Sequence, residues 1–494
     1  MVRLNNNLHL IYILGSPRRY KSQSALAMLQ LFSPLAKDAW STPALIFALP
    51  VLGIASATVL DYLRQLVAPK RSTQPPEVFH WLPMIGSAIE YGNDPLSFFT
   101  GCRSKYGDIF TFVLLGKRIT VTLGPKGNNF VLGGKSIAFN AEDASTSFTT
   151  PVFGKDVIYD VPNEKFMEQK RFVKGGLTMD NLRAYVGMIE DEVLNYINVD
   201  STFQHSRSQG GEKGCGTFDV VKVLQEITIL TAARTLQGKE VRANMDKTFA
   251  QLYNDLDGGS TPIVWMFPNA PLERVRKRDR AQKKMSEFYI IIIKKRREKW
   301  DNGFEDDVSR QHTSSTTSSW AFPDAAFPSF TLRHANGEMH PLTYESLRSL
   351  PVLDAVIRET LRMHPPIHGI MRHVREDVAV PTSVFADTTN NLSTHYVIPK
   401  GHYVLASPAI SQVDEAIWRH ADKWDPLRWL SDPEGVAEKA YKTYLNEDGE
   451  KIDYGFGAVS KGTESPYQPF GAGRHRCIGE HVRVGLLCWA HREM

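Results

Sequence analysis

The stretch Phe470-Gly-Ala-Gly-Arg-His-Arg-Cys477-Ile-Gly479 decides the fold that we expect for this chain. Its cysteine lies in a loop between glycines and basic residues, just before an apolar run. Glycines allow the backbone to approach a flat cofactor closely. The basic residues and a following helix N-terminus favour the ionised sulfur. Because a thiolate ligand on haem iron favours cleavage of the O–O bond, the stretch predicts oxygen activation at a haem-thiolate centre.

The composition of the 494-residue chain is that of an ordinary globular protein, with 42% hydrophobic and 23% charged residues. A formal net charge of +4 gives no indication of a nucleic-acid partner. The four cysteines, Cys102, Cys215, Cys477 and Cys488, include no CxxC pair and no zinc spacing. This pattern argues against a disulfide framework and fits a reducing compartment.

The segment Ser41–Leu60 contains no charged residue. A bilayer-spanning helix needs about 20 apolar residues, so residues 41–60 predict a single transmembrane anchor. A buried core helix is the alternative. Residues 1–40 form an N-terminal extension that we expect to be disordered, with a mitochondrial presequence as the alternative.

Beyond the anchor, residues 61–494 read as one mainly α-helical domain with small β-sheets. A hairpin is expected around Gly116, between two runs of β-branched and aromatic residues. Helical spacing covers residues 180–200, 218–238 and the basic segment 271–300. Pro351 suits the first turn of another helix, which Pro365 and Pro366 end.

On this last helix, Glu359 and Arg362 are three residues apart and share a face. Arg428 follows in an Asp-Pro-Leu-Arg-Trp segment, and the cysteine loop comes next. The ordered set of Glu-x-x-Arg, Pro-x-Arg and the cysteine loop resembles the cytochrome P-450 family. Further segments resemble its fungal sterol 14α-demethylases: Thr150–Asp160, Met167–Gly175, Arg358–Arg372 and Gln311–Trp320, together with His475 in place of the arginine that is usual there.

The resemblance implies a role for each matching residue. Cys477 would be the proximal iron ligand, with Phe470 packed against its sulfur and Gly471 and Ile478 against the haem. The haem propionates would be held by four residues, Tyr159, Lys170, Arg372 and His475. The sterol cavity would be lined by Phe153, Tyr159, His312, Ile370 and Met371. Thr313, helped by His312, would relay protons during oxygen activation. Glu359, Arg362 and Arg428 would form a buried structural network.

The resemblance breaks at two places. Gly303–Arg310, which precedes the segment with Thr313, is polar and has no apolar stripe, although the family has a long helix there. Two prolines in Ala321–Phe330 then disfavour the helical continuation. The tail after residue 480 no longer resembles the family. We therefore expect the haem domain to be incomplete around residues 300–340 and after residue 480.

The function implied by the resemblance is oxidative removal of the 14α-methyl group of lanosterol or eburicol in ergosterol biosynthesis. The implied cofactor is haem b, with dioxygen as co-substrate and electrons from NADPH through a membrane-bound reductase. The implied location is the endoplasmic reticulum membrane, with the catalytic domain in the cytoplasm. Two alternatives remain open: a cytochrome P-450 for another apolar substrate, and a non-catalytic or misfolded remnant of such an enzyme.

Overall fold

The computed structural model describes residues 42–67, 73–82, 85–157, 159–200, 203, 219–246, 248–259, 264, 267–301, 343–381, 384, 396–445 and 462–481. The chain divides into two compact units, Met1–Ala68 and Pro69–Met494. The predicted residues His312 and Thr313 and the predicted extension 1–40 lie outside the described residues. So do the predicted breaks around 300–340 and after 480, apart from residues 300, 301 and 481.

Helix α2 (Thr42–Val67) covers the predicted anchor and continues seven residues beyond Leu60. The helical part of that prediction is therefore confirmed. Among the described residues, no helix reaches the length and apolar character that a membrane crossing requires.

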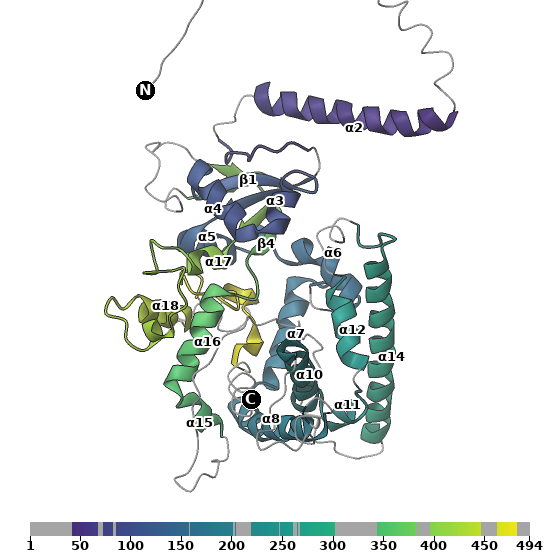
Figure 1. Cartoon of the computed structure of the whole chain (residues 1–494), viewed down its shortest axis with the longest axis vertical. Coiled ribbons are helices and arrows are strands. Elements are labelled where there is room, and N and C mark those ends of the chain that lie inside the picture. The colour runs from purple at the N-terminus through teal and green to yellow at the C-terminus, as the bar shows by residue number, and fades with distance from the viewer. Residues whose placement is uncertain are drawn as a thin grey trace, which may run out of the picture. The chain divides into compact units, whose positions relative to one another are not determined.

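The second unit is mainly helical (Figure 1). Its α-helices are α3 (Ala88–Asn93), α4 (Pro95–Tyr106), α5 (Gly124–Leu132), α6 (Glu142–Phe153), α7 (Asn163–Gly175), α8 (Met179–Val199), α10 (Val220–Ala232), α11 (Lys239–Ala243), α12 (Thr248–Asp257), α14 (Glu273–Asp301), α15 (Tyr344–Arg348), α16 (Pro351–Met363), α17 (Pro408–Gln412) and α18 (Val436–Leu445). A π-helical turn, η1 (Ala233–Gln237), and the 3-10 turns η3 (Pro426–Trp429), η4 (Gly473–His475) and η5 (Ile478–His481) are the further helical elements with bounds in the described part of the unit.

One five-stranded sheet has the order β1-β2-β7-β4-β3. Its strands are β1 (Ile109–Leu114), β2 (Lys117–Thr122), β3 (Phe139–Asn140), β4 (Ile370–Val374) and β7 (Tyr403–Ala406), and a second sheet pairs β5 (Val378–Ala379) with β6 (Val397–Ile398). The predicted hairpin is confirmed as β1 and β2, with Leu115 and Gly116 both at positive φ, as a tight two-residue hairpin turn requires. Strand β7 pairs in parallel with β2 and antiparallel with β4, so it joins the N-terminal hairpin to a late segment of the chain.

The two faces of this sheet pack against different parts of the unit. Phe110 and Phe112 of β1 join Phe99 of α4 in one core cluster. Ile109 of β1 points to the other face, where the cluster includes Ala472 of the cysteine loop. Alternate strand residues point to opposite faces, which explains this division. The sheet therefore helps to fix the position of the loop that carries Cys477.

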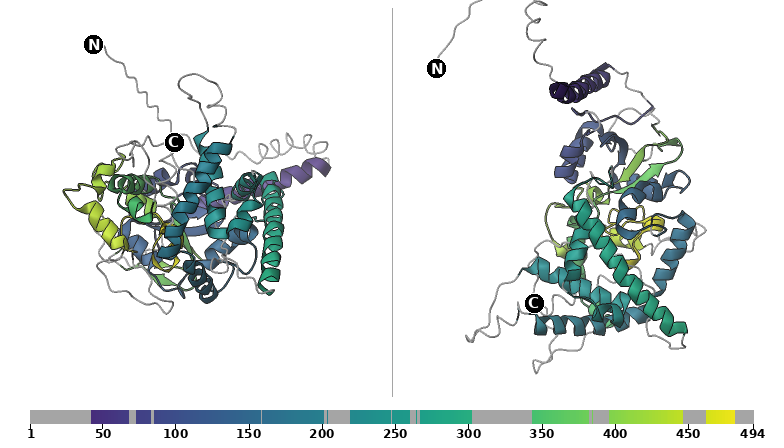
Figure 2. Two further views of the ribbon diagram at one scale, coloured as in Figure 1. Left: turned by 90° about the horizontal axis from the view of Figure 1, so that it is seen from below. Right: turned by 90° about the vertical axis from the view of Figure 1, so that its right-hand side faces the viewer.

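Helices form the remaining cores. Residues of α8, α10, α15 and α16 share a cluster against which Phe470 packs. The basic helix α14 packs against α12, with Met285 and Ile292 buried in their shared cluster. Figure 2 shows α14 as a long helix along one side of this helical layer. The cysteine loop thus contacts a sheet-based core through Ala472 and a helical core through Phe470.

Candidate active site

The cysteine loop has a tightly determined backbone. Gly471 and Gly473 have φ values of 71° and 68°, in the region that L-residues rarely adopt. A Cβ at Gly473 would lie 2.6 Å from the carbonyl oxygen of Leu132, so the loop passes very close to α5. The Cys477 N–H donates to the Phe470 oxygen over 3.1 Å. The loop therefore closes on itself and presents Cys477 at its end.

The Cys477 side chain is accessible to solvent, whereas Cys102 is buried in the core. Dense protein packing around the Cys477 sulfur nevertheless raises the pKa of its thiol, and the Gly479 N–H and the Lys170 charge only partly oppose this. The basic residues Lys170 and Arg476 do favour the ionised sulfur, as predicted, but in the cofactor-free chain desolvation has the larger effect on the thiol pKa. Metal binding would displace the proton, since the thiolate is the metal-ligating form.

Lys170 of α7 reaches the same loop. Its Nζ donates to the carbonyl oxygens of Arg474 and Arg476 over 2.8 and 2.6 Å. Burial lowers the pKa of Lys170 to about 8, and the charge of Cys477 opposes this shift. Lys170, predicted to hold a haem carboxylate, thus also connects α7 to the backbone on the N-terminal side of Cys477.

His475 belongs to a stack of rings. Its ring lies 5.2 Å from that of Phe166, which in turn lies 5.0 Å from that of Tyr159. Burial, followed by the charge of Arg372, lowers the pKa of His475 well below its usual value. The imidazole is therefore neutral, and its Nδ1 is buried without a hydrogen-bond partner.

Arg372 on β4 is a buried cation, with 6% of its surface exposed. Its guanidinium donates to the neighbouring Met371 oxygen over 2.8 Å, and in the described part of the chain no carboxylate lies within ion-pair distance of it. Burial lowers the pKa of Arg372, with opposing effects from Tyr159 and Glu142. A buried charge needs a partner, so Arg372 and the unsatisfied His475 together fit a ligand that brings anionic groups.

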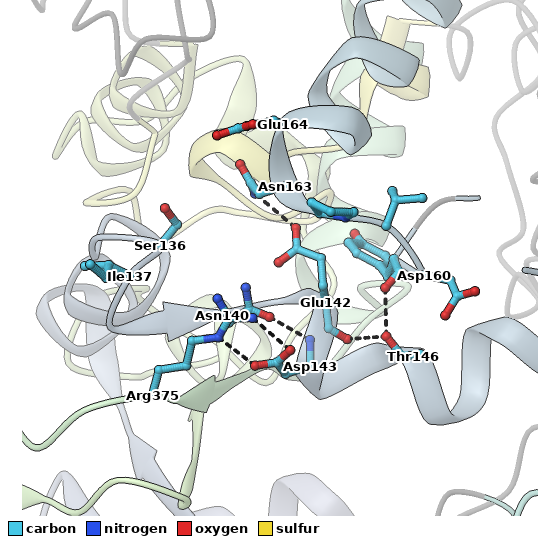
Figure 3. Close-up of a pocket in the computed structure, with 13 residues that line it drawn as sticks. Ser136, Ile137, Asn140, Glu142, Asp143, Thr146, Asp160, Asn163, Glu164 and Arg375 are labelled. Carbon is cyan, nitrogen blue, oxygen red and sulfur yellow. Dashed lines mark hydrogen bonds and ion pairs between the residues drawn. The ribbon is translucent and has the colours of Figure 1, made fainter. Parts of the chain in front are cut away.

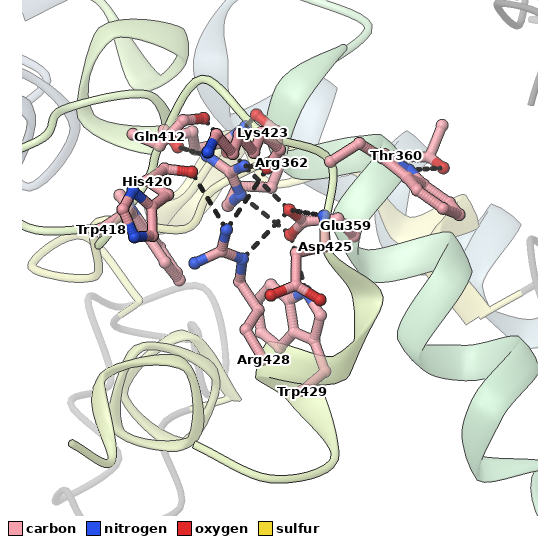
Figure 4. A network of polar contacts seen from close by, with 12 residues as sticks. Glu359, Thr360, Arg362, Gln412, Trp418, His420, Lys423, Asp425, Arg428 and Trp429 are labelled. Carbon is pink, nitrogen blue, oxygen red and sulfur yellow. Dashed lines mark hydrogen bonds and ion pairs between the residues drawn. The ribbon is translucent and has the colours of Figure 1, made fainter. Parts of the chain in front are cut away.

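Behind the loop, Glu359 and Arg362 of α16 are fully buried (Figure 4). The carboxylate accepts two bonds of 2.9 Å from Arg362 and one of 3.0 Å from Arg428 Nε. Burial alone would raise the pKa of Glu359, but the hydrogen bonds and charge of Arg362, with Asp425 N–H and Arg428, hold it below its usual value. The structure thus brings together the three residues predicted as a network.

The same network is connected to the backbone of the cysteine-loop region. Gln412 donates to the Leu361 and Arg362 oxygens, and its own Oε1 accepts from the Gln468 N–H over 2.8 Å. Gln468 lies two residues before Phe470. The glutamine pair therefore links α16 to the segment that enters the loop, a connection that sequence reasoning missed because the two residues are 56 positions apart.

The predicted sterol-lining residues do not meet in one described cavity. Phe153 is 37% exposed at the end of α6, and Ile370 and Met371 pack against the two core clusters on opposite faces of the sheet. Tyr159 lines a cavity of about 560 Å³, but the other walls of that cavity are mostly polar. They include Glu142, Asp143 and Arg375 (Figure 3). This cavity differs from the apolar one that a sterol requires.

The sequence matches the cytochrome P-450 family over residues 76–322 and 332–482, and the chain belongs to this family. It is 46% identical to the lanosterol 14-alpha demethylase of Mycosarcoma maydis, over 94% of this chain and 91% of that protein. It is 44% identical to the eburicol 14-alpha-demethylase of Uncinula necator, over 86% of this chain and 84% of that protein. A solved structure of cyanobacterial CYP120A1 with retinoic acid bound superposes with a TM-score of 0.58 at 18% identity, covering 85% of this chain and 91% of that chain. The fold is therefore that of a cytochrome P-450.

The residues of the loop fit haem, the cofactor that this family implies. Haem carries two carboxylates and an iron atom. Arg372 and His475 offer a buried cation and an unsatisfied ring nitrogen for the carboxylates, and Cys477 offers an accessible sulfur for the iron. Glycines at positions 471 and 473 let the loop adopt the positive φ angles with which it presents Cys477.

Proposed function

We propose that this chain is a sterol 14α-demethylase of the fungal type, which oxidatively removes the 14α-methyl group of lanosterol or eburicol. The support is the 40–46% identity to curated fungal proteins with that activity, over most of both chains. The family membership itself makes the chain a haem-dependent monooxygenase that uses dioxygen and electrons from a reductase.

The observation that carries the proposal is the position of Cys477. It is accessible at the end of a constrained loop, next to buried cationic and neutral donors that have no anion. Haem bound through a cysteine thiolate supplies the oxidising chemistry. The chain's own residues would bind and orient it: Cys477 at the iron, and Phe470, Gly471 and Ile478 along the ring.

Four side chains would hold the haem carboxylates: Tyr159, Lys170, Arg372 and His475. Arg372 would contribute a charge that is already desolvated, so its ion pair with a carboxylate would be strong. Lys170 would add its charge while its Nζ stays bonded to the loop carbonyls. Glu359, Arg362 and Arg428 would keep the loop rigid from behind.

Substrate contacts are proposed for Phe153, Tyr159, His312, Ile370 and Met371, and proton delivery for Thr313 with His312. Their support is the sequence similarity to the sterol demethylases. We further propose that the apolar run 41–60 attaches the chain to the endoplasmic reticulum membrane, where NADPH electrons arrive through a membrane-bound reductase. An apolar sterol substrate partitions into the same membrane.

The reduced carbon-monoxide difference spectrum of the purified chain tests the site. A thiolate-type Soret band is expected from the wild type, and none from Cys477→Ala. Cys102→Ala is the matched control, because Cys102 packs in the core between α4 and the sheet and should leave the band in place. A wild type with a histidine-type band, or without haem, would contradict the proposal.

The substrate is tested separately. Addition of lanosterol or eburicol should produce a type-one spectral shift, and turnover with a reductase and NADPH should release formate. A thiolate band without any sterol response would instead favour a cytochrome P-450 for another apolar substrate.

A further inference from the structure

The residues on either side of Cys477 are joined to each other. Arg476 Nε and Nη2 donate to the two carboxylate oxygens of Glu480, each over 2.8 Å. This two-bond geometry matches the fork of the guanidinium to the carboxylate. The ion pair spans Cys477, Ile478 and Gly479, so it closes a short ring of chain around the cysteine.

A third residue attaches this ring to α18. The Tyr444 hydroxyl donates to Glu480 Oε2 over 3.1 Å, and the Tyr444 carbonyl oxygen accepts from Arg476 Nη1 over 2.6 Å. The Arg476 guanidinium also lies 3.6 Å from the centre of the Tyr444 ring. Tyr444 has no exposed surface and Glu480 only 4%, so the contacts are made away from water.

Burial raises the free-energy cost of breaking these contacts. The side chains of Arg476 and Glu480 are 11% and 5% exposed. Removal of either side chain breaks a mostly buried ion pair, which costs more free energy than loss of a surface pair. Lys170 holds the carbonyl of Arg476 from the side of α7. A mostly buried charge pair therefore flanks the cysteine.

We propose that Arg476, Glu480 and Tyr444 form a brace that positions the Cys477 sulfur, beyond the residues expected to touch the haem. The brace keeps the sulfur in the orientation that an iron ligand needs, and this consequence rests on the proposed function. Its three members act through the loop, and they are positioning residues.

The first arm of the test uses the cofactor-free protein. The rate at which a maleimide alkylates Cys477 is measured by mass spectrometry in Glu480→Gln and in Arg476→Gln. Loosening of the loop predicts an increase of about three-fold or more in both variants. A change in local charge alone predicts opposite effects, because loss of Glu480 would lower the pKa of Cys477 and loss of Arg476 would raise it.

The matched control is Glu438→Gln. Glu438 forms an i,i+4 ion pair with Lys442 on the exposed side of α18, with 68% and 47% of the two side chains exposed. This pair has the same spacing as Arg476 and Glu480, and its loss should leave the alkylation rate unchanged. Tyr444→Phe removes a single hydroxyl and serves if the charge variants fail to fold.

The second arm uses haem-loaded protein. Both charge variants should lower the fraction of the carbon-monoxide complex with a thiolate-type band, while a merely structural role would lower thermal stability without changing that fraction. The proposed brace would be contradicted if Glu480→Gln and Arg476→Gln had the same alkylation rates and the same thiolate-band fractions as Glu438→Gln. A wild type without a thiolate band would overturn the proposed function, and the alkylation rates would still decide on the brace.

Discussion

Glu359 is a fully buried carboxylate that is surrounded by hydrogen-bond donors and two arginine cations. It accepts five hydrogen bonds, from Arg362 twice, Arg428, Trp429 and the Asp425 N–H. Its pKa is held below the usual value, so its ionised form contributes stability above pH 4.5, and that contribution is lost as the pH falls through the folded pKa. Its role is thus to fix geometry through a network that tolerates no partial removal.

Glu359→Gln should lower the free energy of unfolding by about 3–5 kcal/mol, because Arg362 would become a buried charge without a counter-ion. The measurement is urea denaturation of the cofactor-free protein. Asp180→Asn is the control, since Asp180 pairs with Arg183 on the surface with 92% of its side chain exposed, and its loss should cost at most about 1 kcal/mol. A loss below about 1 kcal/mol for Glu359→Gln would show that the network is dispensable.

His402 gives a second prediction at this scale. Burial and then the charge of Arg118 lower its pKa from 6.5 to about 4, and its Nδ1 is buried without a partner. Between these pH values the unfolded chain binds a proton that the folded chain does not, so stability should fall as the pH drops from 6.5 to 4. After allowance for partial exposure, the loss should be about 1–2 kcal/mol. His402→Gln should remove this part of the pH dependence, and an unchanged pH profile in that variant would rule out His402 as its source.

At the scale of elements, the cysteine loop depends on positive φ angles at Gly471 and Gly473. Gly473 has a further constraint, because α5 leaves no room for a side chain beside the Leu132 carbonyl. Gly435, which precedes α18, also has a positive φ of 67°, but nothing lies within 4 Å of the position its Cβ would occupy. A comparison of alanine variants at Gly435 and Gly473 therefore separates the cost of backbone strain from the cost of steric overlap.

Gly435→Ala should cost only the conformational strain, about 1–2 kcal/mol. Gly473→Ala should cost clearly more and should also reduce the amount of haem bound per chain, because the loop must move away from α5. Calorimetric unfolding and haem stoichiometry measure the two effects. Equal losses in both variants would mean that the contact with α5 does not constrain the loop.

Local patterns were sufficient to predict several elements. The β1–β2 hairpin, α8, α14 and the start of α16 at Pro351 all follow from spacing, turn residues and proline placement. The resemblance to the cytochrome P-450 family also implied that Glu359, Arg362 and Arg428 are partners. In contrast, the bonds of Lys170 to the loop carbonyls and the link from Gln412 to Gln468 join residues that lie far apart in the sequence. Such contacts depend on how elements pack, which a local pattern does not specify.

The brace around Cys477 could be predicted from the sequence only in part. Arg476 and Glu480 have the i,i+4 spacing of a helical ion pair, and this signal was present in the sequence. The strength of the pair comes from burial under Tyr444, which became visible only in the folded chain. The raised thiol pKa of Cys477 has the same origin, because the sequence shows the neighbouring charges but not the desolvation.

For the whole molecule, the buried cationic site should make stability depend on haem. A ligand that binds only the folded state adds about 2.7 kcal/mol at a free concentration 100 times its dissociation constant. The melting temperature of the cofactor-free protein should therefore rise steadily as hemin is added. Arg372→Met should weaken this rise, since it removes a buried positive charge and keeps an apolar stem.

Arg183→Met is the corresponding control, because Arg183 lies on the surface of α8 with 51% of its side chain exposed. Its hemin response should equal that of the wild type. The same rise in Arg372→Met and in the wild type would show that this arginine does not bind the haem carboxylates.

The parallel pairing of β2 with β7 also has a consequence for synthesis on the ribosome. Ile119 pairs with Tyr403, 284 residues later in the chain. At about 5–20 residues per second, the hairpin must wait on the order of 15–60 s for its neighbouring strand to be translated. During that interval the open edge of β2 and its apolar face are exposed to other nascent chains, so a chaperone that shields strand edges should increase the yield of native protein.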